Sequence, residues 1–68
     1  MRIRDLREDN YLTQTDIANY LHIKQNTYSQ YENGQRQLPL EMLIALAKFY
    51  KTSTDYILGL TDEKKPYR

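Results

Sequence analysis

Cysteine is absent from this sequence, and histidine occurs only once, at position 22. Without cysteine, neither a disulfide nor a thiolate zinc site can hold the fold together. A single histidine with no carboxylate cluster near it offers too few ligands for a metal centre, so we expect no metal and no other cofactor. No apolar run is long enough to span a bilayer or to act as a signal peptide. We therefore expect a cytoplasmic protein with no membrane partner.

An excess of charge of one sign is also missing. Ten Lys and Arg residues stand against nine Asp and Glu residues, which gives a formal net charge of +1. Many nucleic-acid-binding domains are strongly basic. If this chain binds DNA, its positive charge must therefore be concentrated at the binding surface.

The sequence contains no recognisable catalytic constellation either. A serine nucleophile needs a base and an orienting acid, and nothing in the sequence predicts such partners for Ser29 or Ser53. We therefore expect that the protein is not an enzyme. The 68 residues are enough for one small domain with a compact core, so we expect no small-molecule ligand.

The sequence does contain five short helical patterns, and no segment has the alternation of a strand. Asn10 is a candidate left-handed end of the first helix, and Thr13 and Ser53 are candidate N-caps. Asn33-Gly34 and Gly59 are the expected ends of the third and fifth helices. The expected helices cover residues 1–9, 14–21, 25–32, 40–50 and 54–58. These patterns predict an all-α domain over residues 1–60, followed by a flexible polar tail over residues 61–68.

The fourth helix is the most apolar. Its expected core face consists of Leu40, Leu43, Ile44, Ala47 and either Phe49 or Tyr50.

The third helix has two different faces. Five carboxamides lie between residues 24 and 36, namely Gln25, Asn26, Gln30, Asn33 and Gln35. With Gln25 at zero on a helical wheel, the residues Ser29, Asn33, Asn26 and Gln30 fall between roughly 40° and 140°. Tyr28 and Tyr31 fall at roughly 300° and 240°, on the opposite side. The phenols are thus expected to pack on the domain, and the amides to point outward.

Such a stripe could simply be a solvated helix surface, but surface helices usually carry Lys and Glu, which are better helix formers. Amides have a specific use, because they can pair with N6 and N7 of adenine in the major groove of DNA. The preceding helix and the three-residue turn 22–24 complete a helix-turn-helix pattern. Ala18 supplies the small residue where the two helices cross, and Ile23 can fill the angle between them.

The segment LTQTDIANYLHIKQNTYSQYENGQR resembles the Cro/repressor-type helix-turn-helix, also called the XRE family. The resemblance continues through LPLEMLIALAKFY and STDYILGL, so it covers residues 1 to about 60. It implies five helices, with the third in the major groove, and usually a two-fold dimer on a palindromic operator.

Carried over by position, the resemblance implies three groups of site residues. The base-reading positions are Gln25, Asn26, Ser29 and Gln30. The phosphate-contacting positions are Gln14, Lys24, Thr27, Asn33, Gln35 and Arg36. Gln14 would also brace the first reading residue. Arg7 and Glu32 match a partly buried ion pair that joins the first helix to the end of the third.

The sequence departs from the family pattern at four positions. His22, Tyr11 and Lys51 stand where the family often has glycine, and His22 is expected to be left-handed. Lys24 replaces a usual Ser or Thr cap, so a cap is lost and a charge for phosphate is gained.

These observations predict a sequence-specific regulator of transcription that binds double-stranded DNA and acts as a repressor. The alternative is a protein-interaction module, such as an antirepressor or a coactivator-like domain, that keeps the fold without DNA binding. Tyr56, Ile57 and Leu60 are the candidate dimer seam, although these residues could instead close the core.

Overall fold

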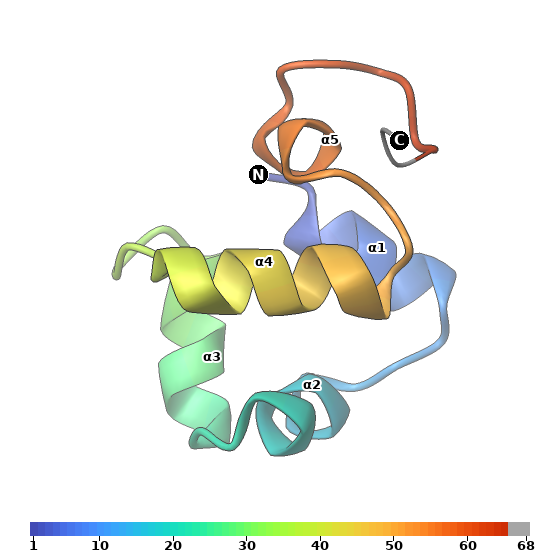
Figure 1. The fold of residues 1–68 in the computed structure, drawn as a ribbon. Coiled ribbons are helices and arrows are strands. Elements are labelled where there is room, and N and C mark those ends of the chain that lie inside the picture. Colours follow the sequence, from blue (N-terminus) through green and yellow to red (C-terminus); the bar gives the residue numbers. More distant parts are fainter. Residues whose placement is uncertain (66–68) are drawn as a thin grey trace.

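The computed structural model describes residues 1–65, and residues 66–68, the end of the predicted tail, lie outside the described part. Five helices and no strand occur within residues 1–65, which confirms the predicted all-α fold (Figure 1). The helices are α1 (Ile3–Asp9), α2 (Gln14–Leu21), α3 (Gln25–Glu32), α4 (Leu40–Phe49) and α5 (Thr54–Leu58).

Local sequence chemistry explains where the helices begin. The N–H of Asp16 donates to Thr13 Oγ1 at 3.1 Å, and the N–H of Thr13 donates to Asp16 Oδ2 at 2.9 Å. This reciprocal pair is a capping box, which satisfies two free donors at the start of α2. Ser53 also caps a helix, α5, by accepting from the N–H of Tyr56 at 3.0 Å. Both predicted caps are confirmed.

Residues with a left-handed backbone conformation lie at the end of several helices or just after it. His22 and Gly59 are the left-handed C-caps of α2 and α5, with φ of 59° and 83°. The prediction for Asn10 is wrong by one residue, because Asn10 has φ of −98° and Tyr11 has φ of 58°. Asn10 instead ends α1 by donating its side-chain amide to the carbonyl of Leu6 at 2.7 Å.

The core lies where all five helices meet, and each helix contributes at least one fully or nearly fully buried side chain. Its buried members are Ile3, Leu6, Ile17, Ala18, Tyr28, Tyr31, Leu38, Leu43, Leu46, Ala47 and Ile57. The predicted core face of α4 is partly wrong. Leu43 and Ala47 are buried, and Tyr50, the alternative to Phe49, is half-buried against the core. Leu40, Ile44 and Phe49 are exposed, and Leu46 is fully buried instead.

Arg2 joins the beginning of the chain to α5 and to the segment after it. Its N–H donates to the carbonyl of Ile57 at 2.8 Å, and its guanidinium lies 4.2 Å above the ring centre of Tyr56. The guanidinium also donates to the carbonyl of Thr61 and to Asp62 Oδ1, both at 2.7 Å. The N-terminus and α5 therefore lie side by side (Figure 1).

Candidate nucleic-acid interface

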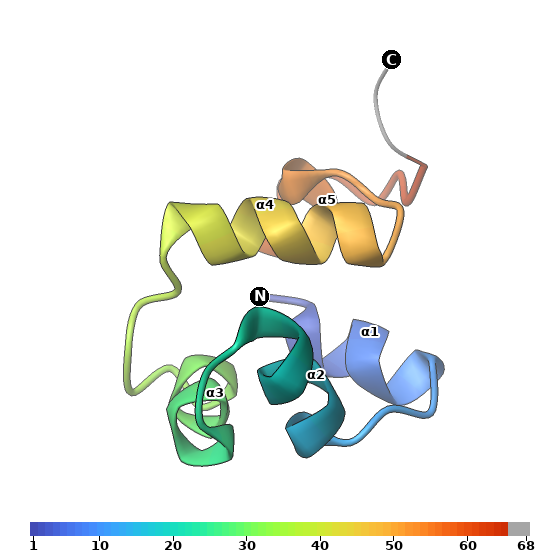
Figure 2. The ribbon, with the colours of Figure 1, turned by 60° about the horizontal axis from the view of Figure 1, so that its bottom comes forward.

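Helices α2 and α3 pack against each other across the short turn between them (Figure 2). Ala18 is buried at the crossing, and the half-buried Ile23 packs against the core. The N–H of Ile23 donates to the carbonyl of Ala18 at 3.0 Å, which closes the turn. His22 is left-handed, as predicted. This is the geometry of a helix-turn-helix.

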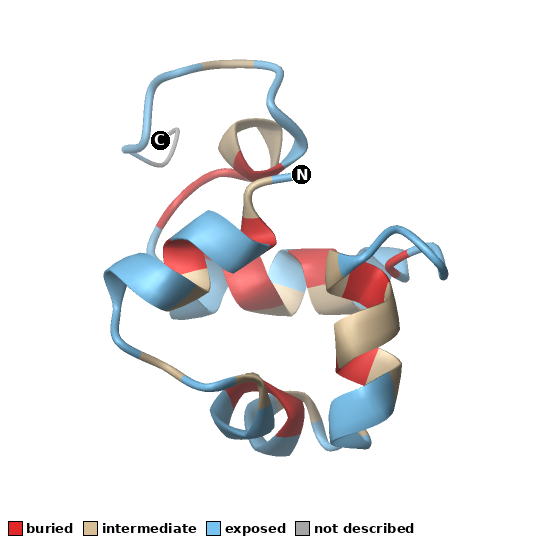
Figure 3. Cartoon of the chain, turned by 180° about the vertical axis from the view of Figure 1, so that it is seen from behind, coloured by how far each residue is buried: buried red, intermediate tan, exposed pale blue. Residues whose placement is uncertain are grey.

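The two faces of α3 are arranged as the helical wheel predicts. Tyr28 is fully buried and Tyr31 is 5% exposed. Gln25, Asn26 and Asn33 are exposed, and three residues between them are half-buried, namely Thr27, Ser29 and Gln30. Figure 3 shows the first turn of α3 on the outside of the molecule, with the buried positions beginning further along. The phenols thus anchor α3 and leave its amides available to a partner.

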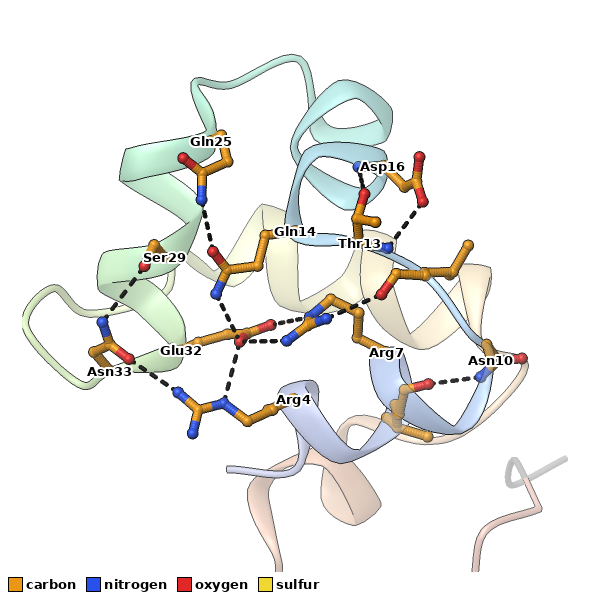
Figure 4. Close-up of polar contacts among 12 residues, drawn as sticks. Arg4, Arg7, Asn10, Thr13, Gln14, Asp16, Gln25, Ser29, Glu32 and Asn33 are labelled. Carbon is orange, nitrogen blue, oxygen red and sulfur yellow. Dashed lines mark hydrogen bonds and ion pairs between the residues drawn. The ribbon is translucent and has the colours of Figure 1, made fainter.

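Glu32, at the end of α3, receives hydrogen bonds from two other helices (Figure 4). Arg7 of α1 donates through Nε to Oε2 at 2.7 Å and through Nη2 to Oε1 at 3.2 Å. Gln14 of α2 donates to Oε1 at 3.1 Å. The ion pair that the resemblance implies is therefore present, and Arg7 also donates to the carbonyl of Leu12 at 2.9 Å.

The side chain of Glu32 is fully buried but remains charged. Burial raises its pKa, but the hydrogen bonds from Arg7 and Gln14 and the nearby Tyr28 hydroxyl outweigh burial and lower the pKa to about 2. The Tyr28 hydroxyl lies near Glu32 without the geometry of a hydrogen bond. The hydrogen bond to Glu32 in turn raises the pKa of Arg7.

Gln14 connects this buried pair to the first base-reading candidate. Nε2 of Gln25 donates to Oε1 of Gln14 at 2.7 Å, and Gln14 passes its own Nε2–H to Glu32. Since Glu32 can only accept, the amide of Gln14 has one possible orientation, and Gln25 must approach with its nitrogen. The brace implied by the resemblance is thus present.

Arg4 takes part in this network, and the sequence interpretation missed it. Its Nε donates to Glu32 at 3.3 Å, and its Nη2 donates to Oδ1 of Asn33 at 2.9 Å. Nδ2 of Asn33 lies 3.4 Å from Oγ of Ser29. The available signal was the three-residue spacing of Arg4 and Arg7, which places both guanidinium groups on one side of α1.

The remaining phosphate-contact candidates surround the exposed face of α3. Lys24 is exposed and starts α3 without a side-chain cap, as its replacement of Ser or Thr predicts. Gln35 and Arg36 are exposed in the loop after α3, and their N–H groups donate to the carbonyl of Gln30 at 2.9 and 3.3 Å. The start of α3 and this loop therefore carry one exposed cation each.

The predicted dimer seam needs correction. Ile57 is completely buried in the core of the chain, so it cannot offer a surface to a second copy. Tyr56 is half-buried under Arg2, and only Leu60, at 74% exposed, is freely accessible. The exposed Leu58 was missed as a seam candidate. It borders a surface groove that also includes Met1, Tyr31, Leu38, Leu40 and Leu43.

Two kinds of feature are missing from residues 1–65. No three side chains of His, Asp or Glu come together there in a way that could hold a metal ion. None of the helices described there combines the length and the apolar character needed to cross a bilayer.

Comparisons with known proteins find relatives that are named as regulators of transcription. The uncharacterized HTH-type transcriptional regulator YobD of Bacillus subtilis (strain 168) is 42% identical over 65 residues, which are 96% of this chain and 58% of that protein. The cryptic phage CTXphi transcriptional repressor RstR of Vibrio cholerae is 45% identical over 49 residues, 72% of this chain and 44% of the repressor. The HTH-type transcriptional regulator ImmR of Bacillus subtilis (strain 168) is 34% identical over 64 residues, 94% of this chain and 50% of that regulator.

The chain spans about half the length of these curated relatives. No solved structure is a significant match. The helix-turn-helix family model matches residues 3–57, which include all of α1 to α4 and most of α5. The chain therefore belongs to the helix-turn-helix family, and the resemblance to its Cro/repressor type is confirmed.

Proposed function

We propose that this protein is a sequence-specific regulator of transcription that binds double-stranded DNA with α3 in the major groove and acts as a repressor. The observation that carries the proposal is the orientation of α3, whose two tyrosines are buried while Gln25 and Asn26 are exposed. An α-helix fits the major groove, and carboxamides can read the edges of base pairs there.

Gln25 is prepared to read adenine while it is braced. Its Nε2 carries two hydrogens, and one of them is used by Gln14. The second hydrogen and Oε1 remain, which together match N7 and N6 of adenine. Asn26, Ser29 and Gln30 are the other proposed base-reading residues. Each good bidentate pair contributes about 1–3 kcal/mol of discrimination between bases.

Contacts to phosphate set the register of α3 on the duplex. We assign these contacts to Gln14, Lys24, Thr27, Asn33, Gln35 and Arg36. Gln14 retains one N–H after its bond to Glu32, so it can donate to a phosphate while it braces Gln25. Lys24 and Arg36 supply local positive charge in a chain whose formal net charge is only +1.

A palindromic operator and a homodimer complete the proposal. Two copies would place their α3 helices roughly 34 Å apart, one turn of DNA. The proposed seam consists of the exposed Leu58 and Leu60 and the apolar groove beside Leu58, with Tyr56 at its margin.

A selection of duplexes from a random library tests the base-reading role. We expect wild type to select a defined sequence, and Gln25→Ala to lose the preference for one adenine. An unchanged preferred sequence in Gln25→Ala would remove Gln25 from the reading set. No selection by wild type, together with no binding at low salt, would instead favour a protein-interaction module with this fold.

Lys24→Ala tests the proposed phosphate contact of Lys24. It should weaken binding to all sequences about equally and reduce the salt slope by about 1. The measurement is a fluorescence titration at several salt concentrations. A salt slope equal to that of wild type would contradict the phosphate contact.

A further inference from the structure

We propose that Arg4, on α1, binds a phosphate of the DNA backbone at the end of α3, beside the phosphate contact of Asn33. This role rests on the proposed function, because it adds a contact from a further helix to the same DNA-binding surface. The family resemblance does not imply it, and it follows from the charges and the hydrogen bonds around Glu32.

Arg4 supplies a positive charge that the protein itself does not neutralise. Arg4 and Arg7 form ion pairs with the same carboxylate, that of Glu32, and neither pairs with a second acidic side chain within residues 1–65. Arg7 makes the closer pair, with hydrogen bonds of 2.7 and 3.2 Å, whereas Arg4 makes a single bond of 3.3 Å. Two guanidinium groups against one carboxylate leave one positive charge in excess beside the end of α3.

The guanidinium of Arg4 also keeps hydrogen-bond donors for a ligand. An arginine side chain has five N–H donors. The Nε–H of Arg4 goes to Glu32, and one N–H of Nη2 goes to Oδ1 of Asn33 at 2.9 Å. Within residues 1–65, no atom accepts the other three with hydrogen-bond geometry, and the side chain is 51% exposed. Phosphate oxygens only accept, and guanidinium groups pair well with them. Arg4 can therefore bind a phosphate without releasing Glu32 or Asn33.

The end of α3 lies where the DNA backbone passes if Gln25 reads a base. Helix α3 rises about 12 Å from Gln25 to Asn33, which is comparable with the width of the major groove, about 12 Å. With the first turn of α3 at the base edges, its end lies beside the phosphates that border the groove. Figure 4 shows the guanidinium of Arg4 beside Asn33, at the opposite end of the hydrogen-bond network from Gln25. Arg4 thus lies next to a side chain that is itself a proposed phosphate contact.

The two hydrogen bonds of Arg4 also hold its side chain in place before DNA arrives. A long side chain that must be immobilised on binding loses conformational entropy, which weakens the complex. The bonds to Glu32 and Asn33 restrict the guanidinium of Arg4 in the free protein. A phosphate contact from Arg4 therefore costs less entropy than one from a freely moving surface arginine.

A fluorescence titration at several salt concentrations tests this contact, with the duplex that wild type selects. Arg4→Gln removes the charge and keeps an amide donor beside Glu32. We expect its affinity at low salt to fall about tenfold for all sequences alike and its salt slope to be reduced by about 1. Arg4→Lys keeps the charge and should keep the slope. Lys48→Ala is the matched control, because Lys48 is an exposed cation beside a separate depression on α4, and its slope should equal that of wild type.

Neutral backbone substitutions locate the phosphate. A series of duplexes carries an uncharged methylphosphonate in place of one phosphate at a time. We expect wild type to lose affinity at one phosphate where Arg4→Gln loses none. Asn33→Ala should lose its sensitivity at the same phosphate or at the neighbouring one. Circular dichroism establishes that each variant is folded, and Arg4→Met, which keeps most of the aliphatic stem, replaces Arg4→Gln if that variant is unfolded.

The failure of the proposed function and the failure of this contact give different results. A wild-type protein that binds no duplex at low salt would overturn both. If wild type binds DNA, a salt slope of Arg4→Gln equal to that of wild type would overturn the contact alone, even with a lower affinity, because Arg4 would then act only as a support for Glu32. An equal reduction of the slope in Lys48→Ala would also overturn it, since net charge alone would explain the effect.

Discussion

At the scale of single residues, Glu32 connects the reading helix to the rest of the domain. Its carboxylate is fully buried and receives hydrogen bonds from α1 and α2. A buried charge is costly unless it is paired and its remaining lone pairs are satisfied. The donors around Glu32 supply this compensation, so the position of α3 depends on them.

Removing Arg7 should therefore destabilise the protein strongly. Arg7→Ala removes the closer, two-bonded charge partner of the buried carboxylate and leaves only the half-exposed Arg4 at 3.3 Å, and we expect a loss of about 3 kcal/mol in the free energy of unfolding. Urea denaturation at pH 7 measures this loss. Glu8→Ala is the matched control, because Glu8 is exposed on the same helix and its removal should change stability by less than about 0.5 kcal/mol. Equal midpoints for Arg7→Ala and wild type would contradict the structural role of the pair.

The pKa of Glu32 predicts how stability depends on pH. Its folded pKa is about 2, below the ordinary value of 4.5. The unfolded state therefore binds the proton more readily, and the contribution of Glu32 is fully present above about pH 4.5. It is lost as the pH falls to about 2, and amounts to about 3 kcal/mol.

Denaturation between pH 2 and pH 7 checks this dependence in wild type and in Glu32→Gln. The variant has no carboxyl group at this position, so most of the slope should disappear. A smaller slope should remain from Asp16, whose pKa is lowered by its hydrogen bonds to Thr13. An unaltered slope in Glu32→Gln would show that other carboxyl groups cause it.

At the scale of helices, the sequence predicted the helix ends better than it predicted which side of each helix faces the core. Thr13, Ser53 and Gly59 carry local signals, because a cap depends on residues that are near in sequence. The orientation of α3 was also predictable, because its polar and aromatic residues lie on opposite sides. Helix α4 is apolar on nearly every side, so periodicity could not show that Leu46 faces the core and Leu40 does not. The contact of Arg4 with Asn33 joins residues 29 positions apart, so the local spacing of Arg4 and Arg7 could not identify Asn33 as a partner.

The backbone is strained near several helix ends, and a substitution can relieve this strain. Tyr11, His22 and Lys51 have positive φ without being glycine. The left-handed conformation costs an ordinary residue about 1–2 kcal/mol. Tyr11 is 95% exposed, so replacing it sacrifices almost no packing. Tyr11→Gly should therefore raise the stability by about 0.5–1 kcal/mol, after the greater freedom of glycine in the unfolded chain is subtracted.

Gly59→Ala provides the reverse comparison. A Cβ at Gly59 would meet no atom within 4 Å, and φ is 83°. The expected loss of about 1 kcal/mol would therefore arise from the backbone alone. Thermal unfolding of both variants gives the two signs. A lower stability in Tyr11→Gly would mean that the loop before α2 depends on the tyrosine side chain.

At the scale of the whole molecule, the surface next to α5 exposes several leucine side chains. Leu40, Leu58 and Leu60 are 68%, 44% and 74% exposed. Arg2 holds α5 and the following segment together through its bonds to Ile57 and Thr61. The proposed dimer seam is therefore built on a braced part of the fold.

A charge introduced at this seam should prevent two copies of the protein from binding together to the two halves of a palindromic site. Leu60→Glu should weaken binding to a full palindrome by about a hundredfold, because the second copy no longer binds as part of the same assembly. Binding to a single half-site should stay the same. Ile44→Glu is the control, since Ile44 is also exposed but lies in a separate surface depression with Lys48 and Lys51. Equal losses in both variants, or none in Leu60→Glu, would place the seam elsewhere.

The inward phenols and outward amides of α3 have an evolutionary consequence. Gln25 and Asn26 contribute nothing to the core, because the buried Tyr28, Tyr31 and Glu32 hold this helix inside the domain. Residues at the outer positions can therefore be substituted without destabilising the fold. A lineage carrying this domain could acquire a new target sequence through two or three such changes, while its thermal tolerance stayed the same.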